Sequence, residues 1–193
     1  MTYNDELMPW VDIETFGLDP RTDPIIEIGI RVTDSQLRTL GEKSWLIWTT
    51  FHDKALERLH RDASYGVKEA TIVLDMHTHN NLFTLAKERG DLRSRVDIEI
   101  QDWLVSNEFT DMAMCGSSVQ FDRAFLANQF QFVESKFHYR NIDVSTVKEL
   151  CRRYRPDLYE KRPDLPQPHR ALPDLTNTIL EFQFYRDEFL NVA

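Results

Sequence analysis

The chain has 193 residues, of which 41% are hydrophobic and 28% are charged, a composition typical of a globular protein rather than a disordered one. Its formal net charge of −9 argues against a protein that holds long nucleic acid on a broad basic surface, because such binding depends on neutralising many phosphates. No apolar run approaches the roughly 18 residues of a membrane span, and the first residues are polar and acidic, so we expect a cytoplasmic protein without a membrane partner.

Three strands are predicted in the first fifty residues, at 10–14, 26–32 and 45–49. From 52 to about 107 the pattern changes to helix, with apolar residues at helical spacing. Within that stretch the sequence assigns no element to 63–81. The first fifty residues are therefore expected to form strands, followed by a helical region.

The second half alternates short strands with helices. A buried strand is expected at 112–115, followed by a turn at 116–118 into a helix, and another strand is expected at 141–144. Thr146 and Glu149 have the spacing of a capping box, which predicts a helix that begins beside them. A proline-rich loop precedes a final helix. Strands followed by alternating helices and strands predict an α/β fold with a central mixed sheet flanked by helices.

The segment WVDIETFGLDP, residues 10–20, places two carboxylates one residue apart in an apolar strand. Because successive side chains of a strand alternate between its faces, Asp12 and Glu14 point the same way. Such a pair costs free energy through desolvation and repulsion unless a cation lies between the two groups. Mg²⁺ takes one or two protein carboxylates together with waters and substrate phosphates, which makes the pair a candidate metal site. The alternative is an exposed sheet edge without a role.

Two further acidic residues lie in the first turns of predicted helices. Asp122 follows the strand at 112–115, and Asp174 lies in the final helix, where Pro173 suits a first-turn position. The helix dipole stabilises a carboxylate at either place, so capping alone could explain each of them. His169 lies in the proline-rich loop before Asp174, where a lone histidine is more often a solvated surface residue.

Four segments together point to a known family. They are WVDIETFGLDP, SSVQFDRAFL, HYRNIDVSTVKEL and HRALPDL. In order and spacing they resemble the oligoribonuclease family of DEDDh 3′-to-5′ exonucleases, and HYRNIDVSTVKEL is highly specific. The resemblance covers about residues 9–190 and is weakest at 50–110. It implies a ribonuclease-H-like fold in which 1–193 is a single exonuclease domain, with its core at 9–190 and a variable helical region at 50–110.

The resemblance also implies the chemistry of the site. The metal ligands of the family's motifs match Asp12, Glu14, Asp122 and Asp174, and the histidine that gives the class its last letter matches His169. Two Mg²⁺ or Mn²⁺ ions per active site, about 4 Å apart, would stabilise the attacking and leaving oxygens at phosphorus. In this interpretation Asp12 bridges both ions, and His169 takes a proton from the attacking water, so that a nucleoside 5′-monophosphate is released.

The substrates implied by the resemblance are short RNA oligonucleotides, especially dinucleotides. Leu18 resembles a wedge between two bases, and Tyr139 resembles an aromatic residue that a partner subunit stacks on a base, which requires a homodimer. The groups matched to the 5′ phosphate are Ser118, Arg140, Ser145 and Thr146. The alternatives are a turn residue tucked into the core for Leu18, and an ordinary surface or dimer contact for Tyr139 and Arg140.

The segment MHTHNNL, residues 76–82, departs from the family's pattern. Thr78 and His79 match the family's Thr-His pair, which makes His79 a candidate substrate contact, but Leu74 stands where the family has tryptophan. A base-stacking platform is worth roughly 1–3 kcal/mol, so its loss predicts weaker or less length-selective binding than the family norm. The aromatic residues that could fill the gap are Tyr65 and Phe83.

The same segment raises two smaller points. Asn80 and Asn81 replace small residues of the family's pattern. His77 and His79 would lie on one side of a strand, which permits a zinc site, but no CxxC motif accompanies them and the two cysteines lie far off in the sequence.

Two other functions remain open. One is a DEDDh exonuclease that trims or proofreads longer RNA or DNA; HYRNIDVSTVKEL argues against it, and the altered middle region leaves it open. The other is a noncatalytic nucleotide-binding protein of the same fold, against which stand five catalytic positions filled with competent residues. The last helix carries large apolar residues that suit either a dimer interface or a deep core. These residues are Phe182, Phe184, Tyr185 and Phe189.

Overall fold

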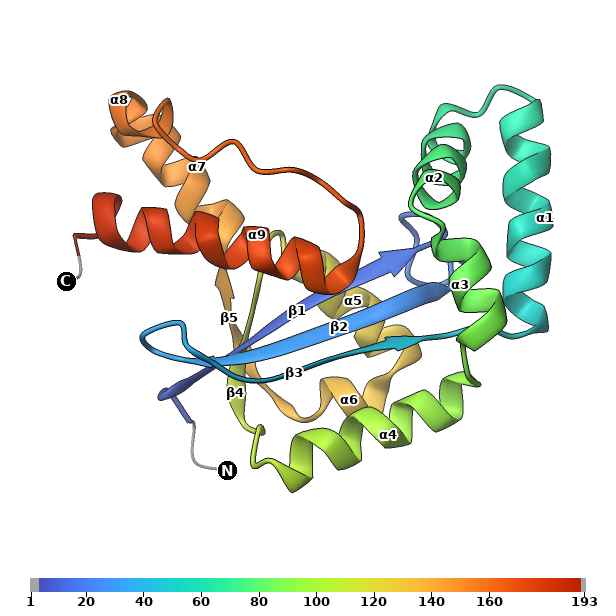
Figure 1. The fold of residues 1–193 in the computed structure, drawn as a ribbon, viewed down its shortest axis with the longest axis horizontal. Helices are drawn as coiled ribbons and strands as arrows, with labels where there is room; N and C mark the ends of the chain where they lie inside the picture. The colour runs from blue at the N-terminus through green and yellow to red at the C-terminus, as the bar shows by residue number, and fades with distance from the viewer. Residues whose placement is uncertain (1–3, 192–193) are drawn as a thin grey trace.

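The computed structural model describes residues 4–191, and within them five strands form one mixed sheet (Figure 1). The strands are β1 (Leu7–Thr15), β2 (Ile25–Asp34), β3 (Thr39–Leu46), β4 (Met112–Gly116) and β5 (Phe137–Asp143). Their order is β3-β2-β1-β4-β5. β2 runs antiparallel to β1 and β3, whereas β4 runs parallel to β1 and β5. The predicted mixed sheet is confirmed.

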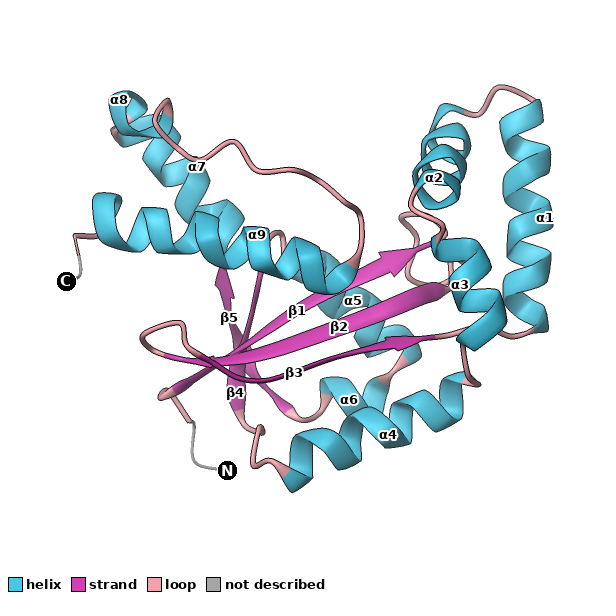
Figure 2. Ribbon diagram, in the orientation of Figure 1, coloured by secondary structure: helices cyan, strands magenta, loops and turns pink. Residues whose placement is uncertain are grey.

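Helices cover both faces and one end of this sheet (Figure 2). In chain order they are α1 (Thr50–Ser64), α2 (Lys68–His79), α3 (Leu82–Arg89), α4 (Arg93–Ser106), α5 (Gln120–Gln129), α6 (Gln131–Glu134), α7 (Val144–Tyr154), α8 (Pro156–Tyr159) and α9 (Ala171–Phe184), with a π-helical turn at Tyr185–Phe189. The predicted helical stretch at 52–107 is confirmed, and the unassigned part of it contains α2. We call α1, α2 and α3 the arm, because they lie together at one end of the sheet (Figure 1). None of the helices in the described range is long and apolar enough to cross a bilayer.

The two faces of β1 serve different layers. Val11 and Ile13 pack with residues of α4, α5 and α6 in one core cluster, whereas Trp10 packs with residues of α7 and α9 in another. The two-residue period of the strand therefore directs Asp12 and Glu14 to the α9 side. Figure 1 shows α9 on this face, with α4 and α6 on the opposite one. The core thus fixes the face that carries the acidic pair.

Two strands differ from the prediction. β3 runs from Thr39 to Leu46 instead of 45–49. Its first residues are mostly exposed and polar, which hides the start of the strand, and Trp48 leaves the sheet to pack into the core of the arm. β5 begins at Phe137 instead of 141. It forms the edge of the sheet, where exposed residues such as Tyr139 obscure the apolar pattern of a strand.

The start of α7 also differs in detail. Asp143 is its N-cap residue, and its Oδ2 accepts the backbone N–H of Thr146 at 3.1 Å. Glu149 pairs with Arg152 on the helix surface instead of reaching back to the cap. The predicted capping box of Thr146 and Glu149 is therefore wrong, and the helix begins at Val144, a residue that was predicted to end the preceding strand.

The apolar residues of the last helix form core. Tyr185 is fully buried, and the ring of Phe182 lies 5.2 Å from that of Trp10. Phe184 and Phe189 are partly buried against the same cluster. Phe182 and Tyr185 therefore belong to the core, as one of the two alternatives predicted, whereas Phe184 and Phe189 lie at its margin.

Candidate active site

Three carboxylates from two elements converge on the α9 face of β1. Asp12 and Glu14 come from the strand, and Asp174 comes from the first turn of α9. One ligand atom from each side chain lies within 4.8 Å of the other two, a spacing at which one cation could be held. The backbone N–H of Arg170 donates to Asp174 Oδ2 at 2.8 Å, which fixes this carboxylate at the start of the helix.

The fourth predicted ligand, Asp122, reaches the same place from α5. Its side chain is buried, and its Oδ1 accepts the backbone N–H of Ile13 at 3.0 Å, between Asp12 and Glu14 on the strand. α5 follows β4, and β4 lies beside β1, so the pairing of these strands sets the contact. The structure thus brings all four predicted carboxylates together. We call Asp12, Glu14, Asp122 and Asp174 the acidic cluster.

The acidic cluster places four like charges close together at a site that is largely buried. Burial, together with repulsion from Asp174 and Glu27, raises the pKa of Glu14 to about 8. Burial raises the pKa of Asp122 to about 7, and burial with repulsion from Asp122 raises the pKa of Asp12 well above its usual range. Burial also raises the pKa of Asp174. Protons can relieve this repulsion, and so can a hard cation with oxygen ligands, so these residues fit a divalent metal site.

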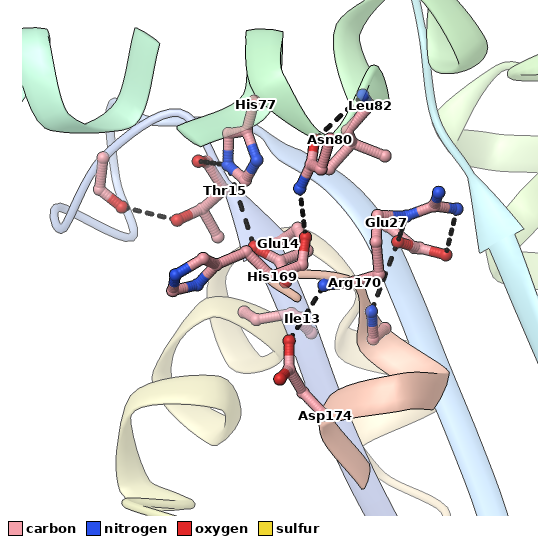
Figure 3. Close-up of polar contacts among 12 residues, drawn as sticks. Ile13, Glu14, Thr15, Glu27, His77, Asn80, Leu82, His169, Arg170 and Asp174 are labelled. Carbon is pink, nitrogen blue, oxygen red and sulfur yellow. Dashed lines mark hydrogen bonds and ion pairs between the residues drawn. The ribbon is translucent and has the colours of Figure 1, made fainter. Parts of the chain in front are cut away.

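His169 lies in the loop at 160–170 that joins α8 to α9. It is partly buried and borders a cavity of about 670 Å³, which the acidic cluster also lines. Its backbone is left-handed, with φ of +52°, a conformation that residues with a side chain rarely adopt. Figure 3 shows His169 beside Glu14, between the arm and Asp174. The predicted histidine therefore shares one cavity with the predicted metal ligands.

Glu27 and Arg170 form an ion pair behind the cluster that the motifs did not identify. Arg170 Nε donates to Glu27 Oε2 at 2.8 Å, and the glutamate, only 2% exposed, also accepts from Ser44 and from the backbone of Ala171. Glu27 on β2 is paired with Glu14 on β1, so Arg170 offsets the charge next to the cluster. A glutamate among the isoleucines of a predicted strand indicated a buried charge that needs a partner. The sequence could not identify that partner, because Arg170 lies 143 residues away.

A second histidine beside the cluster is His77, which the sequence suggested only as a possible zinc ligand together with His79. It is buried, with Nε2 at 3.2 Å from the carbonyl oxygen of Thr15 and 3.7 Å from Glu14 Oε2. Burial lowers the pKa of His77 to about 4, so at neutral pH the ring is uncharged and forms no ion pair with Glu14. One indication of it was present in the sequence, because His77 stands next to the Thr78-His79 pair that was matched to the family's motif.

His79 itself is exposed on α2 and does not line the cavity. Because α2 is a helix, residues two apart point about 200° away from each other around its axis. His77 and His79 therefore do not share a side, as a zinc site on a strand would require.

The serine residues matched to the 5′ phosphate are brought together. The Oγ atoms of Ser118 and Ser145 lie 3.0 Å apart, and Ser118 borders the cavity. Ser117 Oγ is also 3.0 Å from Ser145 Oγ, so three hydroxyls meet at this edge. Thr146 lies beside them, but its hydroxyl donates to Asp143 Oδ2 at 2.6 Å.

The other predicted substrate contacts lie outside the cavity lining. Leu18, on the turn between β1 and β2, is 71% exposed, so it is not tucked into the core. Tyr139 and Arg140 lie on the edge strand β5, where Tyr139 is 73% exposed and the guanidinium of Arg140 lies 5.1 Å from its ring centroid. Leu18, Tyr139 and Arg140 of one chain therefore do not line the cavity that contains the acidic cluster of the same chain.

Neither aromatic residue suggested for the missing tryptophan borders the cavity. Phe83 is buried, with its ring 5.1 Å from that of Phe16 and 5.3 Å from that of His77. Tyr65 follows the last residue of α1 and is 80% exposed. Leu74 is partly buried against the core of the arm.

Comparison with known proteins decides the family. The sequence model of a family described as "Exonuclease" matches residues 94–182. The oligoribonuclease of Azoarcus sp. (strain BH72) is 36% identical over 190 residues, which cover 95% of each chain. The oligoribonuclease of Aromatoleum aromaticum is 34% identical over 196 residues, which cover 100% of each chain. The chain belongs to the oligoribonuclease family. This confirms the family and the enzyme class recognised from the four motifs.

Solved structures place this member of the oligoribonuclease family in a wider fold group. The zinc-bound complex of Escherichia coli exonuclease I with single-stranded DNA gives a TM-score of 0.65 at 16% identity, covering 95% of this chain and 41% of that one. An exonuclease I from Methylocaldum szegediense gives a TM-score of 0.59 at 19% identity, covering 94% and 40%. At such identities the likeness concerns the fold alone, and this chain spans about two fifths of those enzymes. The predicted ribonuclease-H-like fold is confirmed.

Proposed function

We propose that this chain is a metal-dependent 3′-to-5′ exoribonuclease that degrades short oligoribonucleotides, especially dinucleotides, to nucleoside 5′-monophosphates. The observation that carries the proposal is the convergence of four carboxylates and one histidine on a single cavity. Buried acidic groups with perturbed pKa values in a cavity are typical of catalytic sites. Relatives named oligoribonucleases, matched along nearly the whole chain, support RNA as the substrate.

In this proposal the acidic cluster holds the metal. Asp12, Glu14 and Asp174 are the candidate ligands of one cation, and Asp122 helps to hold a second. Carboxylate ligands of this kind suit Mg²⁺ or Mn²⁺. When bound, two such cations stabilise the negative charge that develops on the attacking and leaving oxygens at phosphorus. The four carboxylates offset the concentrated positive charge of the cations.

His169 acts as the general base. Histidine is the side chain that most often serves as a general base, and His169 borders the same cavity as the acidic cluster. It takes a proton from the water that attacks the terminal phosphodiester, while the bond from phosphorus to the 3′ oxygen breaks and that oxygen takes up a proton from solvent to become the new 3′ hydroxyl. Asp174, which interacts electrostatically with His169, stabilises the imidazolium that results.

Groups around the cavity select short substrates. Ser118 and Ser145 offer hydroxyls to a 5′ phosphate, with Thr146 beside them, and the exposed Leu18 can enter between two bases. Tyr139 and Arg140 come from the second subunit of a homodimer. The exposure of Tyr139 supports this assignment, because its side chain lies on the outer edge of the sheet and outside the cavity of its own chain. Arginine suits phosphate through its fork of donors, and an aromatic ring stacks on any base.

A second candidate function is the trimming of longer RNA or DNA. The observation that favours it is that the arm offers no aromatic ring for a base at this place. Leu74 stands where the family has tryptophan, and Phe83 is buried in the core of the arm. A site without that platform discriminates less between a dinucleotide and a longer strand. The two candidates share their chemistry and differ only in the length of the substrate.

The direction of cleavage and its metal dependence test the proposal together. The substrate is a short RNA labelled at its 5′ end, incubated with Mg²⁺, with Mn²⁺ or with a chelator. We expect unlabelled mononucleotides to be released first, only when a cation is present, and we expect Asp12→Asn to abolish the reaction. Asp19→Asn, an exposed acid of the same segment, is the matched control and should retain activity. Early release of the labelled nucleotide, or cleavage in chelator, would overturn the proposal.

A further inference from the structure

The backbone of His169 is held in a conformation that the residue does not favour by itself. Its φ of +52° lies in the left-handed region, which is sparsely populated by residues other than glycine. Such a conformation persists only where surrounding contacts over-determine it. The structure must therefore contain contacts that fix the loop on both sides of this residue.

Asn80, the C-cap residue of α2, provides such a contact from the arm. Its Nδ2 donates to the carbonyl oxygen of His169 at 2.5 Å (Figure 3). It also donates to the carbonyl oxygen of Pro168 at 3.3 Å. The first carbonyl belongs to the peptide unit after His169 and the second to the unit before it. A single amide group that bonds to both restricts the rotation of one peptide plane against the other, and this rotation is what φ and ψ of His169 describe.

The amide of Asn80 is itself held in place. Its Oδ1 accepts the backbone N–H of Leu82 at 3.0 Å, at the start of α3. Leu82 is fully buried in the core of the arm. The contact therefore links the packed arm to the loop at 160–170, two segments separated by about half the chain.

The other side of His169 is anchored on the sheet. The backbone N–H of Arg170 donates to Asp174, and its guanidinium pairs with the buried Glu27. This anchor fixes the chain after His169, whereas Asn80 fixes the two peptide units that flank it. Hydrogen bonds from the arm and from the sheet therefore fix the backbone on both sides of His169.

We propose that Asn80 is a positioning residue that holds the backbone of His169 so that its imidazole faces the acidic cluster. The arm is then part of the catalytic machinery, although Asn80 touches neither the acidic cluster nor the substrate. This inference rests on the proposed role of His169 as general base. It gives a role to the asparagine that stands in place of a small residue in MHTHNNL.

The test compares two substitutions that differ in one contact. Asn80→Asp keeps an oxygen for the N–H of Leu82 and loses both N–H donors to the loop, whereas Asn80→Ala loses all three contacts. Asn81→Gly is the matched control, because Asn81 is the exposed neighbour and its own φ of +61° is one that glycine adopts without strain.

Displacement of a catalytic group by about 1 Å can cost about 10²-fold in rate. We therefore expect both Asn80 variants to lower kcat on a dinucleotide by about 10- to 100-fold, while KM and the affinity for Mn²⁺ change by no more than about threefold. Amide hydrogen exchange at 169–171 should accelerate in both Asn80 variants, measured without metal or substrate. Asn81→Gly should match the original protein in every measurement.

A double-mutant cycle separates positioning from general destabilisation. If Asn80 acts through the imidazole, Asn80→Asp should have no further effect on kcat once His169 is alanine. An equal further loss in that background, or unchanged kcat and unchanged exchange in both Asn80 variants, would overturn the inference. If the original protein lacks metal-dependent hydrolysis, the proposed function fails first and the catalytic role of Asn80 fails with it. An active original protein with unaffected variants removes only the role of Asn80.

Discussion

Within the acidic cluster, Glu14 has a pKa that burial and neighbouring carboxylates raise above neutral pH. It is 7% exposed, it is paired with Glu27 on the neighbouring strand, and its pKa is raised to about 8 by burial and by nearby carboxylates. At neutral pH the metal-free protein therefore holds a proton there. Metal binding must release this proton, which couples the affinity for a cation to pH.

The stability of the metal-free protein should fall as pH rises from 6.5 to 8. The pKa of Glu14 is raised from 4.5 to about 8 and that of Asp122 from 3.8 to about 7, so in this window the folded state keeps protons that the unfolded state has lost. The lowered pKa of His77 has the opposite effect, but only below its unfolded value of 6.5. Thermal unfolding in chelator should show a midpoint several degrees lower at pH 8, and Mg²⁺ should restore it.

Glu14→Gln is the control for this prediction. The amide cannot titrate, so the variant should lose much of the pH dependence between 6.5 and 8 and gain less from added Mg²⁺. A midpoint that stays constant or rises with pH in the original protein would contradict the raised pKa values of the cluster.

His169→Ala should separate catalysis from metal binding. A general base contributes typically about 10²- to 10⁴-fold to rate, whereas His169 is not a member of the group of potential ligands formed by Asp12, Glu14 and Asp174. We expect kcat to fall within that range and the dissociation constant for Mn²⁺, measured by calorimetry, to change by less than about threefold. Comparable losses of both would mean that His169 is not the base.

Single residues could be predicted where a motif names them, and not where a distant contact gives them a role. Asp12, Glu14, Asp122 and Asp174 were predicted from strand periodicity, helix starts and the family resemblance, and they converge as expected. Asn80 was visible only as a departure from a pattern, because its partners lie 88 and 89 residues away.

Among the elements, the start of α9 depends on one ion pair. The guanidinium of Arg170 meets Glu27 at 2.8 Å, with the glutamate 2% exposed. Removing one partner of a buried pair leaves an uncompensated charge, at a cost of about 3–5 kcal/mol. Because the arginine side chain is 27% exposed, we expect Arg170→Met to lower the free energy of unfolding by a value near the lower end of that range.

An exposed ion pair gives the comparison for Arg170. Arg38, with a side chain 79% exposed, pairs with Asp34, and exposed pairs contribute less than about 1 kcal/mol. Urea unfolding of Arg170→Met and Arg38→Met should therefore differ by at least 2 kcal/mol or so in the free energy of unfolding. Equal losses would show that the pair behind the cluster does not hold α9 in place.

Elements were predicted well where burial is periodic and poorly where a tertiary contact sets the boundary. β1 and β2 were expected because isoleucine and valine recur along them, and most of their residues are buried. The ends of β3 and β5 were missed, because Trp48 leaves the sheet for the arm and β5 is an exposed edge. α2 was unassigned because only Ala70 and His77 of its residues are buried.

For the whole molecule, the proposed homodimer makes a specific prediction about Tyr139. Stacking on a base is worth about 1–3 kcal/mol, so Tyr139→Ala should lower kcat/KM on a dinucleotide by roughly 5- to 100-fold. Tyr65→Ala, which removes another exposed tyrosine, should have little effect. Mixing inactive Asp12→Asn with Tyr139→Ala should restore activity, because one site of the mixed dimer is complete. A monomer with full dinucleotide turnover would contradict the shared site.

We propose that the acidic cluster and His169 hydrolyse short RNA with the help of divalent cations. The most direct measurement is the release of nucleoside monophosphate from 5′-phosphorylated RNA of two, three, five and seven residues, with Mg²⁺ or Mn²⁺ and with chelator. The proposed function predicts cleavage only with cation and fastest on the dinucleotide. Similar rates at every length would contradict the dinucleotide preference, and no cleavage at any length would contradict the function itself.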